Sequence, residues 1–252
     1  PTGQDPGLDG VAMAVSSMHA GQLEEAARWA RTVIDDPDVS AGHRADLRVT
    51  LALAATYSRD PATARAATDL ALLGAQAAGA EAAYAFALYA DGELTTPTSP
   101  ERGAARFRDA ARRADRIDAQ HISQVSRLAL FAVLVRQRQH EEALDLALPL
   151  LQDTRRTGVW PQVWTLVRLL AELLMDRERY ADAALLLGAA DTAEGAPPLI
   201  ASDVERRVAG RLRTALGEDV QRGITEVAAG LSRTQVMDRA IALLVEQTHH
   251  RP

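Results

Sequence analysis

The stretch ERYADAALLLGAAD, from Glu178 to Asp191, contains the pattern that decides the fold. Its first six residues form a polar turn that ends in an alanine, and the rest is rich in alanine and leucine, which favour helices. Gly188 stands inside this helical run, where a glycine costs about 1 kcal/mol relative to alanine. The stretch therefore raises the question of what the missing side chain makes room for.

The six-residue turn recurs five times along the chain at a nearly constant spacing. Its closing small residue lies at positions 26, 64, 103, 143 and 183, so the steps are 38, 39, 40 and 40 residues. In each copy an apolar-periodic stretch precedes the turn and a second one follows it. A steady period made of two helices is typical of helical-repeat proteins. The copies are GQLEEA (21–26), RDPATA (59–64), TSPERG (98–103), RQHEEA (138–143) and ERYADA (178–183).

Local signals place the start of a second helix in each copy. Asp60 is a natural N-cap with Pro61 at the first helical position, and Ser99 with Pro100 repeats this arrangement. The sequence predicts that the second helices begin near residues 22, 61, 100, 140 and 180. Apolar residues at spacings of three and four then predict one buried face on each helix, which in the second copy would include Leu70.

The small residue that opens each second helix predicts a close crossing between the two helices of a pair, because a large side chain would push the backbones apart. By the same reasoning Gly188 is expected to touch the segment that closes the stack. The other interpretation is that this glycine is a sequence accident without a close neighbour.

The chain after about residue 195 lacks the repeat and predicts a helical cap, since the end of a stack must present a polar outer face. Its first helix would turn Val204, Val208 and Leu212 inward, and Ser232 with Gln235 reads as a capping box that opens the last helix. The predicted organisation is a linker (1–8), five helix pairs (9–194), a helical cap (195–247) and a tail (248–252).

Composition excludes several classes of function. The 252 residues include no cysteine, and all 28 basic residues are arginine. The missing lysine excludes a P-loop, a Schiff-base lysine and a kinase-type lysine, and the missing cysteine excludes disulfides and thiolate metal sites. A net charge of −6 disfavours direct nucleic-acid binding. No signal pattern or membrane-spanning apolar run is present, so we expect a cytoplasmic fragment of a longer protein.

The turn pattern G-x-[LY]-x-x-A resembles that of the tetratricopeptide repeat. Gly21, Leu23 and Ala26 carry it in the first copy, and Tyr180 and Ala183 carry it in the last. The step is longer than the usual 34 residues of that family, which implies longer helices or extra loop residues. We therefore expect an all-α fold, a right-handed superhelical solenoid of antiparallel helix pairs with a concave groove.

From Val159 onward the chain is similar to the C-terminal repeat region of actinobacterial LuxR-like and SARP (AfsR-like) transcriptional regulators, which carry a STAND-class NTPase module. The similarity rests on the pattern W-x3-W-x3-R followed by LLGAA and LG, and it departs at Gln221 and Ile224, where family members often carry Phe and Trp. It implies a sensor or scaffold arm that receives a ligand or partner. The matching residues are Trp160, Trp164, Arg168, Leu187 to Ala190, Leu216 and Gly217.

Candidate binding residues are those expected on the concave surface built from first helices. Trp160, Trp164 and Arg168 share one helix face, and Trp and Arg are enriched in binding hot spots. The alternative is that the tryptophans wedge the fourth pair against the fifth, with Arg168 capping them. The candidate groove residues are Tyr84, Tyr89, Arg127, Trp160, Trp164 and Arg168.

Two further patterns are interpreted as ordinary surface. The arginine-rich stretch 102–116 is interleaved with acidic residues, which indicates a solvated and self-paired helix face. His19, His43, His121 and His140 are isolated in the sequence and no H-E-x-x-H motif occurs, so we expect no metal, cofactor or catalytic site.

The leading hypothesis is a non-catalytic arm of a bacterial regulator. It would bind a protein or peptide segment, another part of its own parent protein or a small effector, without contacting nucleic acid or a membrane. The alternative is an all-helical enzyme or small-molecule carrier with an enclosed pocket. An active site needs several titratable residues that converge in a cleft, and the sequence shows no such cluster.

Overall fold

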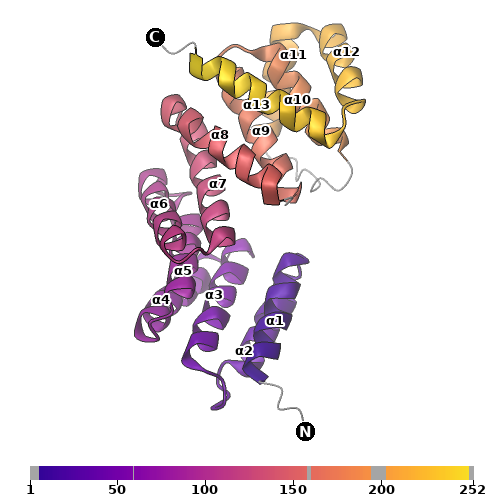
Figure 1. Ribbon diagram of the computed structural model, residues 1–252. Coiled ribbons are helices and arrows are strands. Elements are labelled where there is room, and N and C mark those ends of the chain that lie inside the picture. Colours follow the sequence, from indigo (N-terminus) through magenta and orange to yellow (C-terminus); the bar gives the residue numbers. More distant parts are fainter. Residues whose placement is uncertain (1–5, 59, 158–159, 194–202, 250–252) are drawn as a thin grey trace. The chain divides into compact units, whose positions relative to one another are not determined.

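The computed structural model describes residues 6–58, 60–157, 160–193 and 203–249. This part of the chain forms thirteen α-helices and no strand, which confirms the predicted all-α class (Figure 1). The helices are α1 (Pro6–His19), α2 (Leu23–Val33), α3 (Ala41–Tyr57), α4 (Pro61–Ala77), α5 (Glu81–Thr95), α6 (Pro100–Arg116), α7 (Gln120–Arg136), α8 (His140–Thr157), α9 (Trp160–Asp176), α10 (Tyr180–Thr192), α11 (Asp203–Leu216), α12 (Glu218–Ala229) and α13 (Arg233–His249).

The first ten helices follow one another as five consecutive pairs. Their second members begin at Leu23, Pro61, Pro100, His140 and Tyr180, which confirms the five predicted starts. Helix α1 packs against α2, α3 against α4, α5 against α6 and α9 against α10. The order of elements is therefore the one expected for a helical repeat.

The turn inside a pair has the same backbone geometry in three copies. Gly21, Arg138 and Glu178 stand five residues before the closing alanine and have φ angles of 73°, 57° and 61°. The N–H of each donates to the carbonyl three residues back, and the following N–H donates to the carbonyl five residues back. This arrangement satisfies the last carbonyls of the first helix. Three unlike residues thus adopt one conformation at the same distance from the closing alanine, which is consistent with a helical-repeat arrangement.

The small residue that opens each second helix is buried in all five copies, as predicted. The buried residues are Ala26, Ala64, Gly103, Ala143 and Ala183. At Gly103 an added Cβ would lie 3.0 Å from the Cα of Thr96, closer than real Cβ contacts allow without a shift. The close crossing within each pair therefore depends on these positions.

Gly188 makes room for the cap. A Cβ at this position would lie 3.2 Å from the Cβ of Ala228 and 3.4 Å from the Cα of Thr225, both on α12. The missing side chain therefore lets α12 approach α10 closely, which confirms the predicted contact and answers the question that the sequence raised.

Most predicted helix caps are present. The carboxylate of Asp60 accepts a hydrogen bond of 3.1 Å from the Thr63 N–H. At the start of α13, the Gln235 N–H donates to the Ser232 hydroxyl at 3.3 Å, and the Ser232 N–H donates to the Gln235 side chain at 2.8 Å. Ser99 departs from the prediction, because it stands at the N-cap of α6 without a side-chain cap bond.

The predicted buried faces of the helices agree with the structure at all but one of the described residues named above. Leu70 is 60% exposed, because the buried face of α4 runs through Ala64, Thr68, Ala71 and Ala75, one position away. In the first cap helix Val208 and Leu212 are buried as expected, while the side chain of Val204 lies outside the described residues.

The buried carboxylate of Asp91 connects three helices. Asp91 lies on α5, and its side chain is 5% exposed. One oxygen accepts from Arg65 of α4 at 2.7 Å, and the other accepts from Arg106 of α6 at 2.7 Å. The Thr95 hydroxyl adds a bond of 3.3 Å. A carboxylate with so many charged partners is the arrangement under which a buried charge is tolerated.

The chain divides into two compact units, Pro1–Val133 and Leu134–Pro252. The core of the first unit is rich in alanine, with Val49, Leu53 and Leu88 among its larger members. In the second unit α12 packs on α10 and α13 packs on α8, so the predicted cap shares a unit with the last helix pairs. None of the described helices is long and apolar enough to cross a membrane.

Candidate functional site

Trp164 lies in the core of the second unit. Its side chain is 2% exposed, and its indole Nε1 has no hydrogen-bond partner among the described residues. This placement contradicts the expectation that Trp164 lines an accessible groove and agrees with the alternative, a packing role. The side chain of Trp160 lies outside the described residues.

Arg168 fastens α9 to the end of α10. Its guanidinium donates to the carbonyl of Ala190 at 3.0 Å and approaches the Asp191 carboxylate at 3.4 Å, and its side chain is 14% exposed. A cation at the last carbonyls of a helix stabilises that end. The surroundings of Arg168 thus favour the packing interpretation over a free binding surface.

Arg127 and Tyr84 make separate local contacts in the first unit. Arg127 donates to the carboxylate of Asp115 at 2.8 Å and so connects α7 with α6. The ring of Tyr84 lies 4.8 Å from the Arg113 guanidinium, as in a cation–π pair. Tyr84 also lines a small cavity of about 160 Å³ together with Glu81 and Arg113. Tyr84 packs, like Tyr89, against the alanine-rich core of this unit.

Tyr89 belongs to a row of aromatic side chains on successive first helices. Its hydroxyl lies 2.8 Å from that of Tyr57 on α3, and its ring centroid is 5.7 Å from that of Phe86 on α5. The Phe86 ring in turn meets His121 of α7 edge-on, at 6.2 Å and 85°. We call Tyr57, Phe86, Tyr89 and His121 the aromatic row. It joins the first helices of the second, third and fourth pairs.

The aromatic row is accessible along much of its length. Tyr57 is 42% exposed, His121 is exposed, and Phe86 and Tyr89 are half-buried. Burial, and after it the charge of Glu93, raises the pKa of both Tyr57 and Tyr89. Both hydroxyls therefore stay protonated near neutral pH and can donate hydrogen bonds. The row offers ring faces and hydroxyl groups beside a carboxylate.

Sequence reasoning found Tyr89 but missed Tyr57 and His121 as its neighbours. These residues stand at different positions of the repeat, 7, 14 and 22 residues before the closing small residues at 64, 103 and 143. The row crosses the helices obliquely, so alignment of the copies carries no signal for it.

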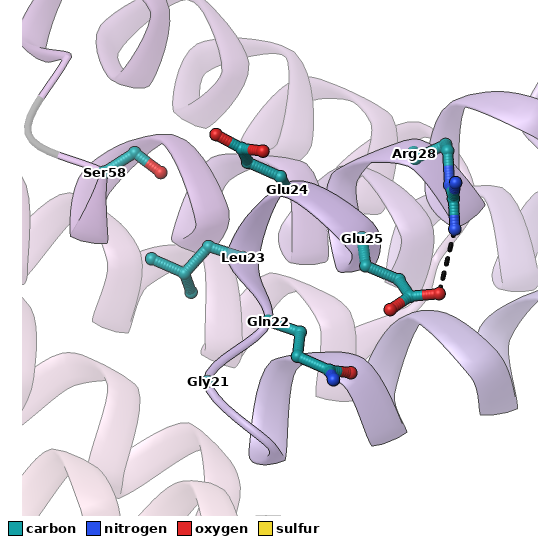
Figure 2. Close-up of a pocket in the computed structure, with 7 residues that line it drawn as sticks. All are labelled: Gly21, Gln22, Leu23, Glu24, Glu25, Arg28 and Ser58. Atoms are coloured by element: carbon teal, nitrogen blue, oxygen red, sulfur yellow. Dashed lines mark hydrogen bonds and ion pairs between the residues drawn. The ribbon is translucent and has the colours of Figure 1, made fainter.

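A wide pocket of about 630 Å³ lies beside the first turn of α2. Glu25 is turned toward Arg28 and pairs with it at 2.8 Å (Figure 2). Acidic residues in the first turn of a helix are stabilised by the positive end of its dipole, which accounts for this cluster without a ligand. The lining residues are Gly21, Gln22, Leu23, Glu24, Glu25, Arg28 and Ser58.

A further cavity, of about 380 Å³, lies in the second unit where the end of α7, the following turn, α9 and α11 meet. We call it the arginine pocket. Its residues come from distant parts of the chain, and sequence reasoning did not find it. The lining residues are Val135, Arg136, Arg138, Glu172, Met175, Asp176, Val208 and Arg211.

The described residues contain no group of three or more His, Asp or Glu placed to hold a metal ion. No protein-family model, curated protein or solved structure matches the chain. The likeness to tetratricopeptide repeats and to bacterial regulators therefore stays a prediction from the sequence.

Proposed function

We propose that the chain is a non-catalytic helical-repeat arm of a bacterial multidomain transcriptional regulator. In this proposal the five pairs stack as a right-handed solenoid, and the first helices form its concave, partner-binding side. The shared turn geometry and the buried small residues at each crossing support a repeat origin of the pairs. The arm itself would catalyse no reaction.

The observation that carries the binding role is the aromatic row. Partly exposed tyrosine and phenylalanine rings are costly to leave in water and are enriched where proteins bind one another. The row extends over three consecutive first helices, which suits an extended or helical segment lying across them.

The chemistry of the row indicates a polypeptide partner. Ring faces accept apolar side chains and the cationic groups of Arg or Lys, and the nearby Glu93 carboxylate favours a cation. The Tyr57 hydroxyl oxygen can accept a hydrogen bond from a main-chain N–H of the partner. A segment of the parent protein outside this chain is the partner that the resemblance to regulators suggests.

The proposal is tested with peptides selected from a random display library against the whole chain. Two double variants are compared, Tyr57→Ala with His121→Ala in the row, and Leu70→Ala with Leu73→Ala on α4 as the control. All four side chains lie at the surface, so both variants should still fold, which thermal melts check. The row variant loses hot-spot side chains, so its affinity for the selected peptides should fall about tenfold. The α4 variant should keep its affinity.

The control is informative because Leu70 and Leu73 form the competing apolar surface on a second helix, where they are 60% and 65% exposed. Peptides that lose affinity in the α4 variant and keep it in the row variant would contradict binding along the first helices.

A further inference from the structure

The arginine pocket has a mainly charged lining over a small apolar floor. Val135, Met175 and Val208 are 2%, 2% and 7% exposed, so the apolar residues that line it belong to the core. Arg136 and Arg138 are exposed. The cavity of about 380 Å³ falls in the range of small-molecule sites, roughly 300–1,000 Å³.

Charge is distributed unevenly in this pocket. Three arginines and two acidic residues line it, an excess of one positive charge in a chain whose net charge is −6. Asp176 is held by Arg211 at 2.7 Å. One of the two acidic residues in the pocket is therefore engaged already.

Two of the three guanidinium groups keep donors available. Arg138 approaches Asp176 only to 3.7 Å, which is longer than a hydrogen bond, and its side chain is 72% exposed. The guanidinium of Arg136 makes no hydrogen bond or ion pair with any residue that the structure describes. The left-handed conformation of Arg138, with φ at 57°, fixes the turn that carries it to the rim.

We propose that the arginine pocket binds a small organic anion, an acidic group on an apolar body. Arg136 and Arg138 hold the acidic group, because the planar guanidinium matches a carboxylate or a phosphate. The hydrocarbon stems of the arginines, above the nearly buried Val135, Met175 and Val208, contact the apolar body. This site goes beyond the proposed partner surface, since it lies in the second unit and needs no residue of the aromatic row.

A bound anion would stabilise the second unit. The ligand would contact the turn after α7, helix α9 and the cap helix α11 together, and a ligand that binds only the folded state raises its stability. The competing explanation is that the arginines only offset the negative ends of α7 and α9. That explanation predicts no need for an apolar body and no saturable site.

The experiment is calorimetric titration of the whole chain with octanoate and phenyl phosphate. Acetate and inorganic phosphate have the acidic group without the apolar body. Octanol has the apolar body without the acidic group. We expect saturable binding of octanoate or phenyl phosphate, at least tenfold tighter than any of the three comparison probes. An Arg136→Gln, Arg138→Gln double variant should lose at least tenfold in affinity.

The matched control is Arg213→Gln with Arg222→Gln, which removes the same charge from exposed cap positions outside the pocket. It should bind as the unaltered chain does. Arg136→Gln alone repeats the test at a residue with no described partner to lose. Absence of saturable binding by both probes, acetate or inorganic phosphate binding as tightly, or equal affinity in the pocket variants would overturn the proposal.

The two proposals fail separately. The pocket double variant should bind the selected peptides normally, and the row double variant should bind the organic anion normally. If the unaltered chain binds the organic anion but no peptide along the row, only the partner surface is wrongly assigned. If it binds the peptides but no organic anion, only the arginine pocket is wrongly assigned.

Discussion

A single position, Gly188, sets how closely the cap approaches the last helix pair. Its helix tolerates the glycine because α12 occupies the space that a side chain would take. Gly210 on α11 is the natural comparison, since it is exposed and an added Cβ there meets nothing within 4 Å. The same residue type thus has a packing role at one site and none at the other.

We predict that Gly188→Leu lowers the free energy of unfolding by about 1–3 kcal/mol through overpacking. Gly210→Leu should leave it unchanged or raise it, because leucine has the better helix propensity. Thermal melts followed by circular dichroism measure both, and the helical signal at low temperature should persist in each variant. An unaffected Gly188→Leu protein would mean that α12 can move away at no cost.

At the scale of the elements, arginine side chains connect one helix with another at several places. Arg168 bonds the end of α10, Arg127 connects α7 to α6, and Arg179 pairs with Asp182 and Glu246. Hydrogen bonds that involve a charged group are stronger than neutral ones. The helices of this alanine-rich protein are thus joined by directional contacts as well as by burial.

We predict that Arg168→Ala lowers the free energy of unfolding by about 1.5–3 kcal/mol, as expected for loss of charge-assisted hydrogen bonds from a largely buried side chain. Arg156→Ala serves as control, since its side chain is 65% exposed and approaches Asp153 only to 3.7 Å. Chemical denaturation of both variants gives the comparison. If Arg168→Ala is as stable as the control variant, its contacts with α10 are incidental and a surface role returns to consideration.

At the scale of the whole molecule, the division into two units predicts that a destabilising substitution affects only the unit that contains it. Gly188→Leu should speed hydrogen exchange in peptides from α9 to α13 and leave those from α1 to α6 unchanged, because contacts concentrate within each unit. Gly92→Leu, which would strike the Phe107 ring in the first unit, should give the reverse pattern. Mass-spectrometric exchange resolves the two, and equal loosening everywhere would show that the units unfold as one.

Sequence reasoning reached those features of the fold that depend on local signals. The five second-helix starts, the buried small residues and the capping box at Ser232 each follow from a few neighbouring residues. The contact of Gly188 was also predicted, although the exposed Gly210 shows that a glycine inside a helix does not by itself imply a close neighbour. Leu70 was misplaced since helical spacing alone fixes a face only to within about one residue.

The binding features could not be predicted in the same way. The aromatic row and the arginine pocket both join side chains from three or more segments, and their meeting depends on how each helix is rotated about its axis. Trp164 and Arg168 illustrate the converse: their spacing of four places them on one face, but only packing decides whether that face points inward. The sequence left both alternatives open there.

Asp91 bears on how such a protein can evolve. Its carboxylate is neutralised by one guanidinium from the preceding pair and one from its own, so the third pair fits beside the second and no other. Exchanging or deleting a copy would bury this carboxylate without Arg65. Under the proposed repeat origin, this contact restricts how the pairs can be exchanged, because the third pair depends on an arginine of the second.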